Sequence, residues 1–492
     1  MFKGLLQKAG LFKADNTAGE DKETAELLKK NRVYFPVESL VGLGHFNRTG
    51  KLVREMVSSG LEVSVASGTF VDEDRFFAGA RTIALPAYVF TAGSGDSFTL
   101  GPDGTRTILP EFNERAQENA RIKAHLDNIE RRRPNILITE FWPFDRSALD
   151  REMESLLIAS KMEAVKASTR LAGDNSLRLI SVRDVMDTPN EENLTPEELE
   201  AKAACEEWTV NMINDNYHAV LVHGDPRFIS LSETFAAADK IKAEIIYTGY
   251  VIDDLPERAV ANGNAAPFLV SCGSGVDGQE MIFSFLTAWE KLLERAGDDV
   301  RDLTSRPVHI ICGPRFAGEH YENVCEWADD LRERFDIDIC VEKYRTDFTS
   351  LLAKASFSLS LAGYNTTLET LAIGTPALFI PKYAYARGNI AFSLEQMYRL
   401  ERLQEKGFAS YAHPSDVQNA ELFAGLLLKA YKEQTAPGAC DKKPQLNFNG
   451  AKNTMAAITR LLEEKRDSGN TLVVHPARPV WNKQARRVMR WS

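Results

Sequence analysis

VYFPVESLVGLGHFNRTGKLVREMVSSGLEVSVA, residues 33–66, is the stretch that decides the fold. It contains an apolar run at 33–37, a glycine-rich turn, a segment of helical periodicity at 47–59 and alternating apolar residues at 62–66. Two parallel strands need a crossover connection of this kind, usually a helix. The stretch therefore predicts a βαβ unit.

The same alternation continues along the first half of the chain. Short apolar runs at 136–139, 179–182 and 219–222 each lie beside a segment with helical periodicity. Strands that are apolar throughout are typical of a parallel sheet covered by helices on both faces. We therefore expect one α/β domain over residues 31–248.

A second βα series fills residues 249–465. Its expected strands lie at 268–272, 308–312, 337–341, 357–360 and 377–380, and its expected helices at 279–296, 321–334 and 367–373. Two Rossmann-like domains in tandem place a cleft between them, and ligands of such sheets bind outside the carboxyl ends of the strands.

Composition excludes several classes of protein. The 492 residues hold 59 Lys and Arg against 70 Asp and Glu, and a net charge of −11 disfavours nucleic acid as a partner. The six cysteines are widely spaced and form no CxxC pair, which fits a reducing cytoplasm better than secretion. No apolar run approaches the roughly 18 residues that a membrane span needs.

Both ends of the chain differ from its acidic body. In a leader at 1–30, apolar residues from Phe2 to Phe12 share one face of a helix, and three lysines lie mostly off that face. In the tail at 466–492, the last 25 residues contain five cations and no acid. These features predict peripheral contact with an anionic membrane. A frayed leader and a tail packed on the body are the alternatives.

The first glycine-rich turn supplies a candidate base. Gly44 and His45 follow the first strand and open the first helix, whose N-terminus favours anionic groups. An imidazole that titrates near neutrality is suited to deprotonating a hydroxyl nucleophile. His45 is therefore the candidate catalytic residue, and capping of the helix is its alternative role.

Two further turns are suited to binding a diphosphate. Gly273, Ser274 and Gly275 open a GxGxxG match between a strand and a long helix, but the next strand ends in CGP instead of the acidic residue that a nicotinamide site needs. Asn365 and Thr366 open another helix after a strand. Two helix starts rich in free amides make a cradle for a nucleotide diphosphate.

Other chemistries find little support in the sequence. The strings Asp72-Glu73-Asp74 and Asp336-Ile337-Asp338 lie on a surface turn and at a strand start, so we expect no catalytic metal. The sequence contains no GxxxxGK[ST] phosphate loop and no GxSxG elbow. We therefore expect no cofactor.

Taken together, the motifs resemble a known family. The run SLAGYNTTLE at 360–369, with GTPA at 374–377, Pro381 and the later Glu395, Gln396 and Arg399, is similar to the donor-binding half of GT-B glycosyltransferases related to glycosyltransferase family 28. CGSGVDG at 272–278, CGP at 312–314, LVHGDP at 221–226 and YTGYV at 247–251 resemble a bacterial branch of predicted glycosyltransferases. The resemblance covers about 31–465.

The resemblance implies a GT-B fold and an inverting, metal-independent hexosyl- or N-acetylhexosaminyltransferase that uses a UDP-sugar. It implies that the Gly273–Gly275 turn with Asn365 and Thr366 holds the diphosphate, Glu369 the ribose, and Glu395 and Gln396 the sugar. His45 matches the histidine of the family's N-terminal glycine loop. Gly44, Glu140 and His223 are weaker candidates for acceptor contacts or for supporting the groups that make them, and Glu140 and His223 could instead satisfy local backbone donors. The segment 382–394 is longer than the family's usual link.

The acceptor implied is a glycan or a lipid-linked hydroxyl in cell-surface polysaccharide or glycolipid synthesis. A nucleotide-sugar epimerase of the same fold is the alternative enzyme, since it would bind the same donor. A non-catalytic sugar-nucleotide sensor or scaffold is the alternative outside catalysis.

Overall fold

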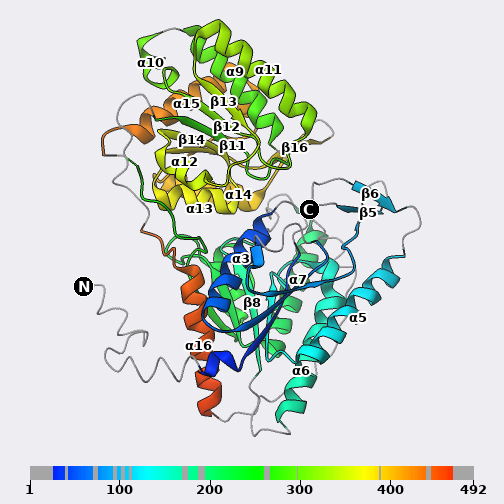
Figure 1. Cartoon of the computed structure of the whole chain (residues 1–492). Coiled ribbons are helices and arrows are strands. Elements are labelled where there is room, and N and C mark those ends of the chain that lie inside the picture. The colour runs from blue at the N-terminus through cyan, green and yellow to red at the C-terminus, as the bar shows by residue number, and fades with distance from the viewer. Residues whose placement is uncertain are drawn as a thin grey trace.

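The chain forms two α/β domains, one above the other in Figure 1. The computed structural model describes residues 26–38, 43–69, 76–91, 97–100, 106–109, 113–168, 176–186, 194–259, 266–276, 278–295, 297–386, 389–438 and 445–468. The predicted leader and basic tail lie almost wholly outside these residues. Within the described part of the chain, no helix has the length and apolarity that crossing a bilayer requires.

The N-terminal domain is built on a parallel sheet in the order β10-β9-β8-β7-β1-β2-β3. Its strands are β1 (Arg32–Pro36), β2 (Glu62–Ser67), β3 (Arg81–Ala84), β7 (Ile136–Glu140), β8 (Leu177–Arg183), β9 (Ala219–His223) and β10 (Glu244–Tyr247). The predicted βαβ unit is β1, α3 (Gly44–Ser58) and β2, with β7 on the other side of β1. The strand order therefore reverses at β1, the place where such sheets bind ligands.

Helices cover both faces of this sheet, as the unbroken apolar strands predict. α3 shares one buried core with side chains such as Val33 and Ile138, and the opposite face is covered by α5 (Glu114–Arg132), α6 (Asp150–Ser168) and α7 (Pro196–Asn216). Because these helices lie on the two faces of the sheet, its carboxyl edge is left free to form a site.

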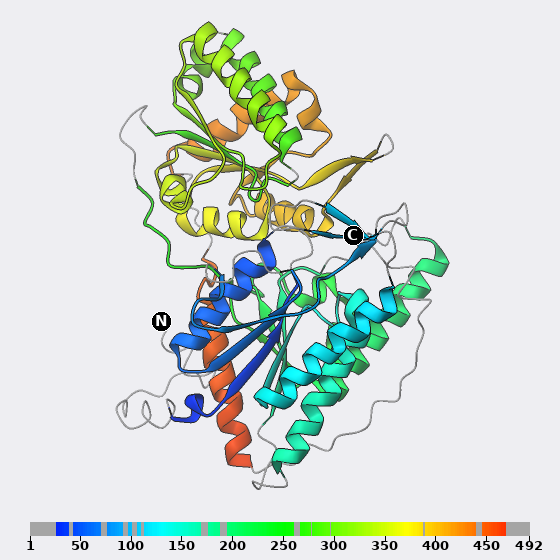
Figure 2. The ribbon, with the colours of Figure 1, turned by 45° about the vertical axis from the view of Figure 1, so that its right-hand side comes forward.

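The C-terminal domain repeats this architecture with the strand order β13-β12-β11-β14-β15-β18. The strands are β11 (Phe268–Ser271), β12 (Val308–Ile311), β13 (Ile339–Glu342), β14 (Phe357–Leu361), β15 (Ala377–Ile380) and β18 (Ser410–Tyr411). One face packs on α9 (Gln279–Arg295), α11 (Gly318–Phe335) and α15 (Ala420–Thr435), and the other on α12 (Phe348–Lys354), α13 (Tyr364–Ile373) and α14 (Leu394–Glu405). Figures 1 and 2 show α13 and α14 on the side that faces the N-terminal domain.

The last described helix differs from the expected domain division. α16 (Gly450–Ser468) packs against α3, and its side chains Met455 and Ile458 belong to the core of the N-terminal domain. Sequence analysis assigned residues up to 465 to the C-terminal domain because helical periodicity does not identify the packing partner. The C-terminal domain is therefore inserted between β10 and α16 of the N-terminal domain.

Two connections join the domains, and they run together. Tyr250 N donates to Asn447 O at 2.7 Å, Gly450 N donates to Tyr250 O at 2.9 Å, and Val251 pairs with Asn449 in an antiparallel bridge. The outgoing and returning chains are thus hydrogen-bonded to each other where they cross between the domains.

Short antiparallel elements lie outside the two main sheets. The N-terminal domain carries β4 (Phe90–Thr91), β5 (Ser97–Leu100) and β6 (Arg106–Leu109), and the C-terminal domain carries a hairpin of β16 (Tyr383–Ala386) and β17 (Asn389–Phe392). Both lie on the same side of the molecule in Figure 2. The hairpin falls within the segment 382–394 that is longer than the family's usual link.

Candidate functional site

The candidate site lies where the carboxyl edges of the two sheets approach each other. β1 leads into α3 and His45, while β7, β8 and β9 end at Glu140, Arg183 and His223. Across the interface, Asn365 Nδ2 in the first turn of α13 donates to Gly44 O at 3.5 Å. Residues predicted independently in the two domains are therefore brought together.

His45 is held by groups on three sides. Its Nδ1 lies 2.5 Å from Glu140 Oε1, and its Nε2 lies 2.9 Å from Arg146 Nη2 and 3.0 Å from Arg183 Nη2. A guanidinium only donates, so Nε2 accepts and the ring proton is on Nδ1, where it is donated to Glu140. The carboxylate of Glu140 thus fixes the tautomer of His45 that presents a lone pair at Nε2.

Burial determines the charge of this pair. It lowers the pKa of His45 to about 3, against the opposing effect of Glu140, so the imidazole is neutral at physiological pH. The expected titration near neutrality is therefore wrong for this arrangement, because burial disfavours the imidazolium. Burial also raises the pKa of Glu140, but His45 and Arg48 outweigh it and hold that pKa well below its ordinary range. The pair is therefore a neutral histidine beside a carboxylate.

Arginines that sequence analysis did not select surround the pair. Arg48 is fully buried and donates from Nη2 to Glu140 Oε1 at 2.5 Å. Its Nε and Nη1 have no hydrogen-bond partner among the residues that the structure describes. Arg183 lies between two rings, with Cζ 5.4 Å from the centroids of both Phe141 and Tyr364. Both arginines had a signal in the sequence, since Arg48 follows His45 by three residues and Arg183 directly follows the strand predicted at 179–182.

Glu395 joins this cationic cluster from the C-terminal domain. It accepts from Arg183 Nη1 at 3.0 Å and from Arg399 Nη2 at 2.6 Å. Burial alone would raise its pKa, but the two arginines lower it to about 2. Its neighbour Gln396 instead accepts a hydrogen bond from Lys382 N at 2.7 Å, so the predicted sugar-binding pair divides into an interface carboxylate and a side chain that holds the start of the β16 hairpin.

Glu369, the predicted ribose ligand, also meets the opposite domain. Lys51 Nζ on α3 lies 3.0 Å from Glu369 Oε1, and the lysine side chain is only 1% exposed. Asp253 Oδ2 is a weaker second partner of Lys51 at 3.8 Å. A nucleotide that binds Glu369 therefore has to compete with a buried ammonium group.

The turn after β11 leaves one glycine open. Gly273 has φ 64° and no atom within 4 Å of the position of a Cβ, whereas a Cβ on Gly275 (φ 86°) would lie 2.7 Å from Cys312 O. Gly275 is thus needed for packing against the next turn, and Gly273 leaves room for a ligand. Ser274 lies between them, with its carbonyl accepting from Arg315 N.

The second predicted diphosphate turn lies beside the first. β11 and β14 are neighbours in the sheet, so the start of α13 with Asn365 and Thr366 adjoins the Gly273 turn. Asn365 Oδ1 is buried without a partner among the described residues, and the Thr366 carbonyl accepts from Thr370. The arrangement leaves the amides of the first helical turn facing the interface.

The hydrogen bonds of His223 indicate a structural role. Its ring nitrogens lie 2.8 Å from Ser181 Oγ and 2.8 Å from Thr248 Oγ1, and its backbone carbonyl accepts from Tyr364 Oη at 2.8 Å. The side chain is fully buried, and burial keeps its pKa well below the ordinary value. His223 thus supports the interface through its backbone while its ring is satisfied within the N-terminal domain.

A pocket adjoins Glu140 on the N-terminal side. It opens at the carboxyl ends of β1 and β7 and is lined by Pro36, Val37, Glu38, Glu140, Trp142, Arg146, Leu149, Glu152 and Met153. Arg121 bridges two of its acids, with Nη2 2.6 Å from Glu38 Oε1 and Nε 2.7 Å from Glu152 Oε2. The cavity therefore lies next to Glu140, and two of its acids, Glu38 and Glu152, are already paired with Arg121.

Comparisons with known proteins identify the C-terminal domain. Residues 270–454 match the model of the glycosyltransferase family 28 C-terminal domain, which confirms the resemblance found in the sequence. No curated protein matches the chain in a sequence search.

Solved structures share the fold over most of the chain. MurG of Acinetobacter baumannii is 11% identical, with 88% of this chain and 99% of that chain covered and a TM-score of 0.54. CalG4, the calicheamicin glycosyltransferase, is 14% identical with coverages of 89% and 98% and a TM-score of 0.52. A putative UDP-N-acetylglucosamine 2-epimerase from Listeria monocytogenes is 14% identical with coverages of 88% and 97% and a TM-score of 0.51. The chain has the GT-B fold.

Proposed function

We propose, on the premise that residues 270–454 form a family 28 glycosyltransferase domain, that this protein transfers a sugar from a nucleotide diphosphate to an acceptor hydroxyl. The domain match and the fold support glycosyltransferase activity. The observation that carries the proposal is the contact between Asn365 and Gly44, because it places the neutral His45 beside the turns that suit a diphosphate.

The donor binds in the C-terminal domain. Its diphosphate lies against the open side of Gly273 and the first turn of α13, where free amides and the helix dipole favour negative charge. Its ribose hydroxyls bind Glu369 in exchange for Lys51. These amides and the nearby arginines stabilise the departing nucleoside diphosphate, so we propose transfer without a metal ion, and with UDP as the nucleotide.

The acceptor reacts on the side of the N-terminal domain. Its hydroxyl gives its proton to His45 Nε2 as its oxygen bonds to the anomeric carbon, and the bond from that carbon to the phosphate oxygen breaks with inversion. Glu140 then stabilises the imidazolium through Nδ1. The acceptor hydroxyl must replace Arg146 and Arg183 as the hydrogen-bond partner of His45 Nε2. The two guanidiniums then bind the anionic phosphates of the donor.

The test is transfer by the full chain from a panel of nucleotide sugars with glycan and lipid-linked acceptors. We expect turnover to require both substrates, to survive excess EDTA and to fall in His45→Ala. His413→Ala, at a surface turn after β18, is the control. Turnover that EDTA abolishes and magnesium restores would contradict metal independence, and a fully active His45→Ala protein would remove the base from the proposal.

Epimerisation of the nucleotide sugar is the second candidate. It is favoured by the fold shared with the putative epimerase from Listeria monocytogenes and by two buried carboxylates, Glu140 paired with Arg48 and Glu395 paired with Arg183. Incubation of the nucleotide sugar without acceptor separates the two functions. A new epimeric nucleotide sugar would replace transfer as the function, and an unchanged donor supports transfer.

We propose a cytoplasmic enzyme that works at the surface of an anionic membrane and modifies a lipid-linked or polysaccharide acceptor. The support is the cationic, acid-free end of the sequence and the lysine-bearing start, on a chain of net charge −11. Co-sedimentation with acidic vesicles at low and high salt tests this location. If the full chain ignores acidic vesicles at low salt, the acceptor is sought among soluble molecules.

A further inference from the structure

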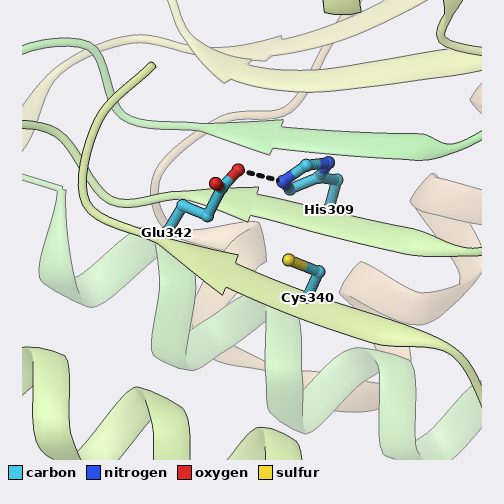
Figure 3. A group of neighbouring side chains, drawn as sticks. All are labelled: His309, Cys340 and Glu342. Carbon is cyan, nitrogen blue, oxygen red and sulfur yellow. Dashed lines mark hydrogen bonds and ion pairs between the residues drawn. The ribbon is translucent and has the colours of Figure 1, made fainter.

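Three potential metal ligands lie together at one edge of the C-terminal sheet (Figure 3). β12 and β13 are parallel neighbours, and their register places His309 opposite Cys340. Glu342 follows Cys340 by two residues, so both project from the same face of β13. The three side chains are therefore gathered by the strand register itself.

The donor atoms are already close. His309 Nε2 lies 2.5 Å from Glu342 Oε2, and one donor atom from each of the three residues falls within 4.8 Å of the others. Figure 3 shows the imidazole and the carboxylate facing each other with the thiol beside them. A common ion with bonds of about 2.0–2.3 Å needs only small side-chain rotations.

The position of the cluster leaves it accessible. The cluster lies on the face of the sheet where α12 and α13 pack on Leu269 and Ile311. This packing does not reach Cys340, which is exposed. The side chains of His309 and Glu342 are 15% and 34% exposed. An ion can reach the site from solvent without the domains moving.

We propose that His309, Cys340 and Glu342 bind one divalent transition-metal ion of the zinc class. Thiolate, imidazole and carboxylate are together the ligands that zinc takes in proteins, and three of them leave the fourth tetrahedral position to water. The ion replaces the hydrogen bond between His309 and Glu342. Arg345 Nη1, 3.1 Å from Glu342 Oε2, keeps the carboxylate oriented.

The site is separate from the transfer reaction. β13 is the edge strand, and β12 lies between it and β11, whose end carries the predicted Gly273–Gly275 turn; β14 with Asn365 lies beyond β11. None of the three ligands belongs to the candidate site, so the ion would join the edge strand to its neighbour without taking part in transfer.

Cobalt titration of the metal-free full chain tests the site directly. Wild-type protein should bind one equivalent of Co²⁺ and develop the thiolate-to-cobalt charge-transfer absorption of a cysteine ligand. Cys340→Ser should abolish this absorption, and His309→Gln should weaken binding at least tenfold. Cys205→Ser, a partly buried free cysteine on α7, is the matched control and should bind as the wild type does.

A second measurement distinguishes loss of the fold from loss of metal binding. Circular dichroism should show native spectra for all metal-free variants, and Zn²⁺ should raise the melting temperature of wild type and Cys205→Ser but not of Cys340→Ser. Absence of the charge-transfer absorption in wild type, or its persistence in Cys340→Ser, overturns the proposal. A zinc-induced rise of the same size in Cys340→Ser overturns it as well.

Discussion

Arg399→Met is expected to destabilise the contact between the domains far more than Arg402→Met, although both arginines lie on α14 and both pair with an acid of the N-terminal domain. Arg399 donates to Asp184 from Nη2 at 2.8 Å and from Nε at 3.2 Å, and the two side chains are 1% and 0% exposed. Arg402 pairs with Glu233 where the side chains are 35% and 27% exposed. The comparison keeps the helix and the residue type constant, and Arg399 differs both in its burial and in its second pair with Glu395 at 2.6 Å.

The magnitude follows from what each substitution leaves behind. Removing one partner of a buried ion pair costs about 3–5 kcal/mol because the other charge stays buried and uncompensated. Asp184 would keep Tyr250 Oη at 3.0 Å as a donor but no cation within the pair. Removing one partner of an exposed pair costs about 0–1 kcal/mol.

Thermal unfolding of the full chain at neutral pH measures the difference. With a shift of about 2–4 °C per kcal/mol for domains of this size, we expect Arg399→Met to lower the melting temperature by about 6–20 °C and Arg402→Met by at most about 4 °C. Equal melting temperatures would refute the reasoning. The double variant Asp184→Leu/Arg399→Met should recover part of the loss, and no recovery would assign the cost to packing instead of charge.

Three further results are expected. His45→Ala should lower turnover about 100-fold to 10,000-fold, as removal of a positioned base does, with donor affinity unchanged in calorimetry; near-normal turnover in a folded variant would contradict this. Glu369→Ala should weaken binding of the nucleoside diphosphate by about tenfold to 100-fold, because charge-assisted hydrogen bonds are worth about 1.5–3 kcal/mol. It should also lower the melting temperature, because Lys51 loses its closest partner. Unchanged affinity would remove Glu369 from the donor site. Glu395 has its pKa lowered from 4.5 to about 2, so its contribution to stability is complete above about pH 4.5 and lost as pH falls towards 2; Glu395→Gln should flatten acid unfolding in that window, and an unchanged profile would argue against the ion pairs.

Much of the fold was predictable because its signals are local. The strand predicted at 377–380 is β15, and the helix predicted at 279–296 is α9, which is described over Gln279–Arg295. Continuous apolar runs bounded by glycine turns determine such elements without help from distant contacts. The packing of α16 on α3 was not predictable, because an apolar helix face indicates burial but not the partner.

The site was predicted in part for a similar reason. The convergence of Gly44 with Asn365 follows from the rule that ligands bind at carboxyl ends of strands. The pairing of Glu395 with Arg183 joins residues that are 212 positions apart in two domains, and no local pattern reports such a contact. The ion pair of Glu369 with Lys51 was missed because a carboxylate at a helix start fits a ribose and a lysine equally well.

The paired crossing of the chain at Tyr250 and Asn447 has a mechanical consequence. A domain attached by one flexible segment can swivel about any axis, whereas two connections hydrogen-bonded to each other resist twisting. Any change in the angle between the domains therefore has to bend both crossings at once. Such a change would also have to break the ion pairs of Arg183 with Glu395 and of Lys51 with Glu369, which tie the two domains together.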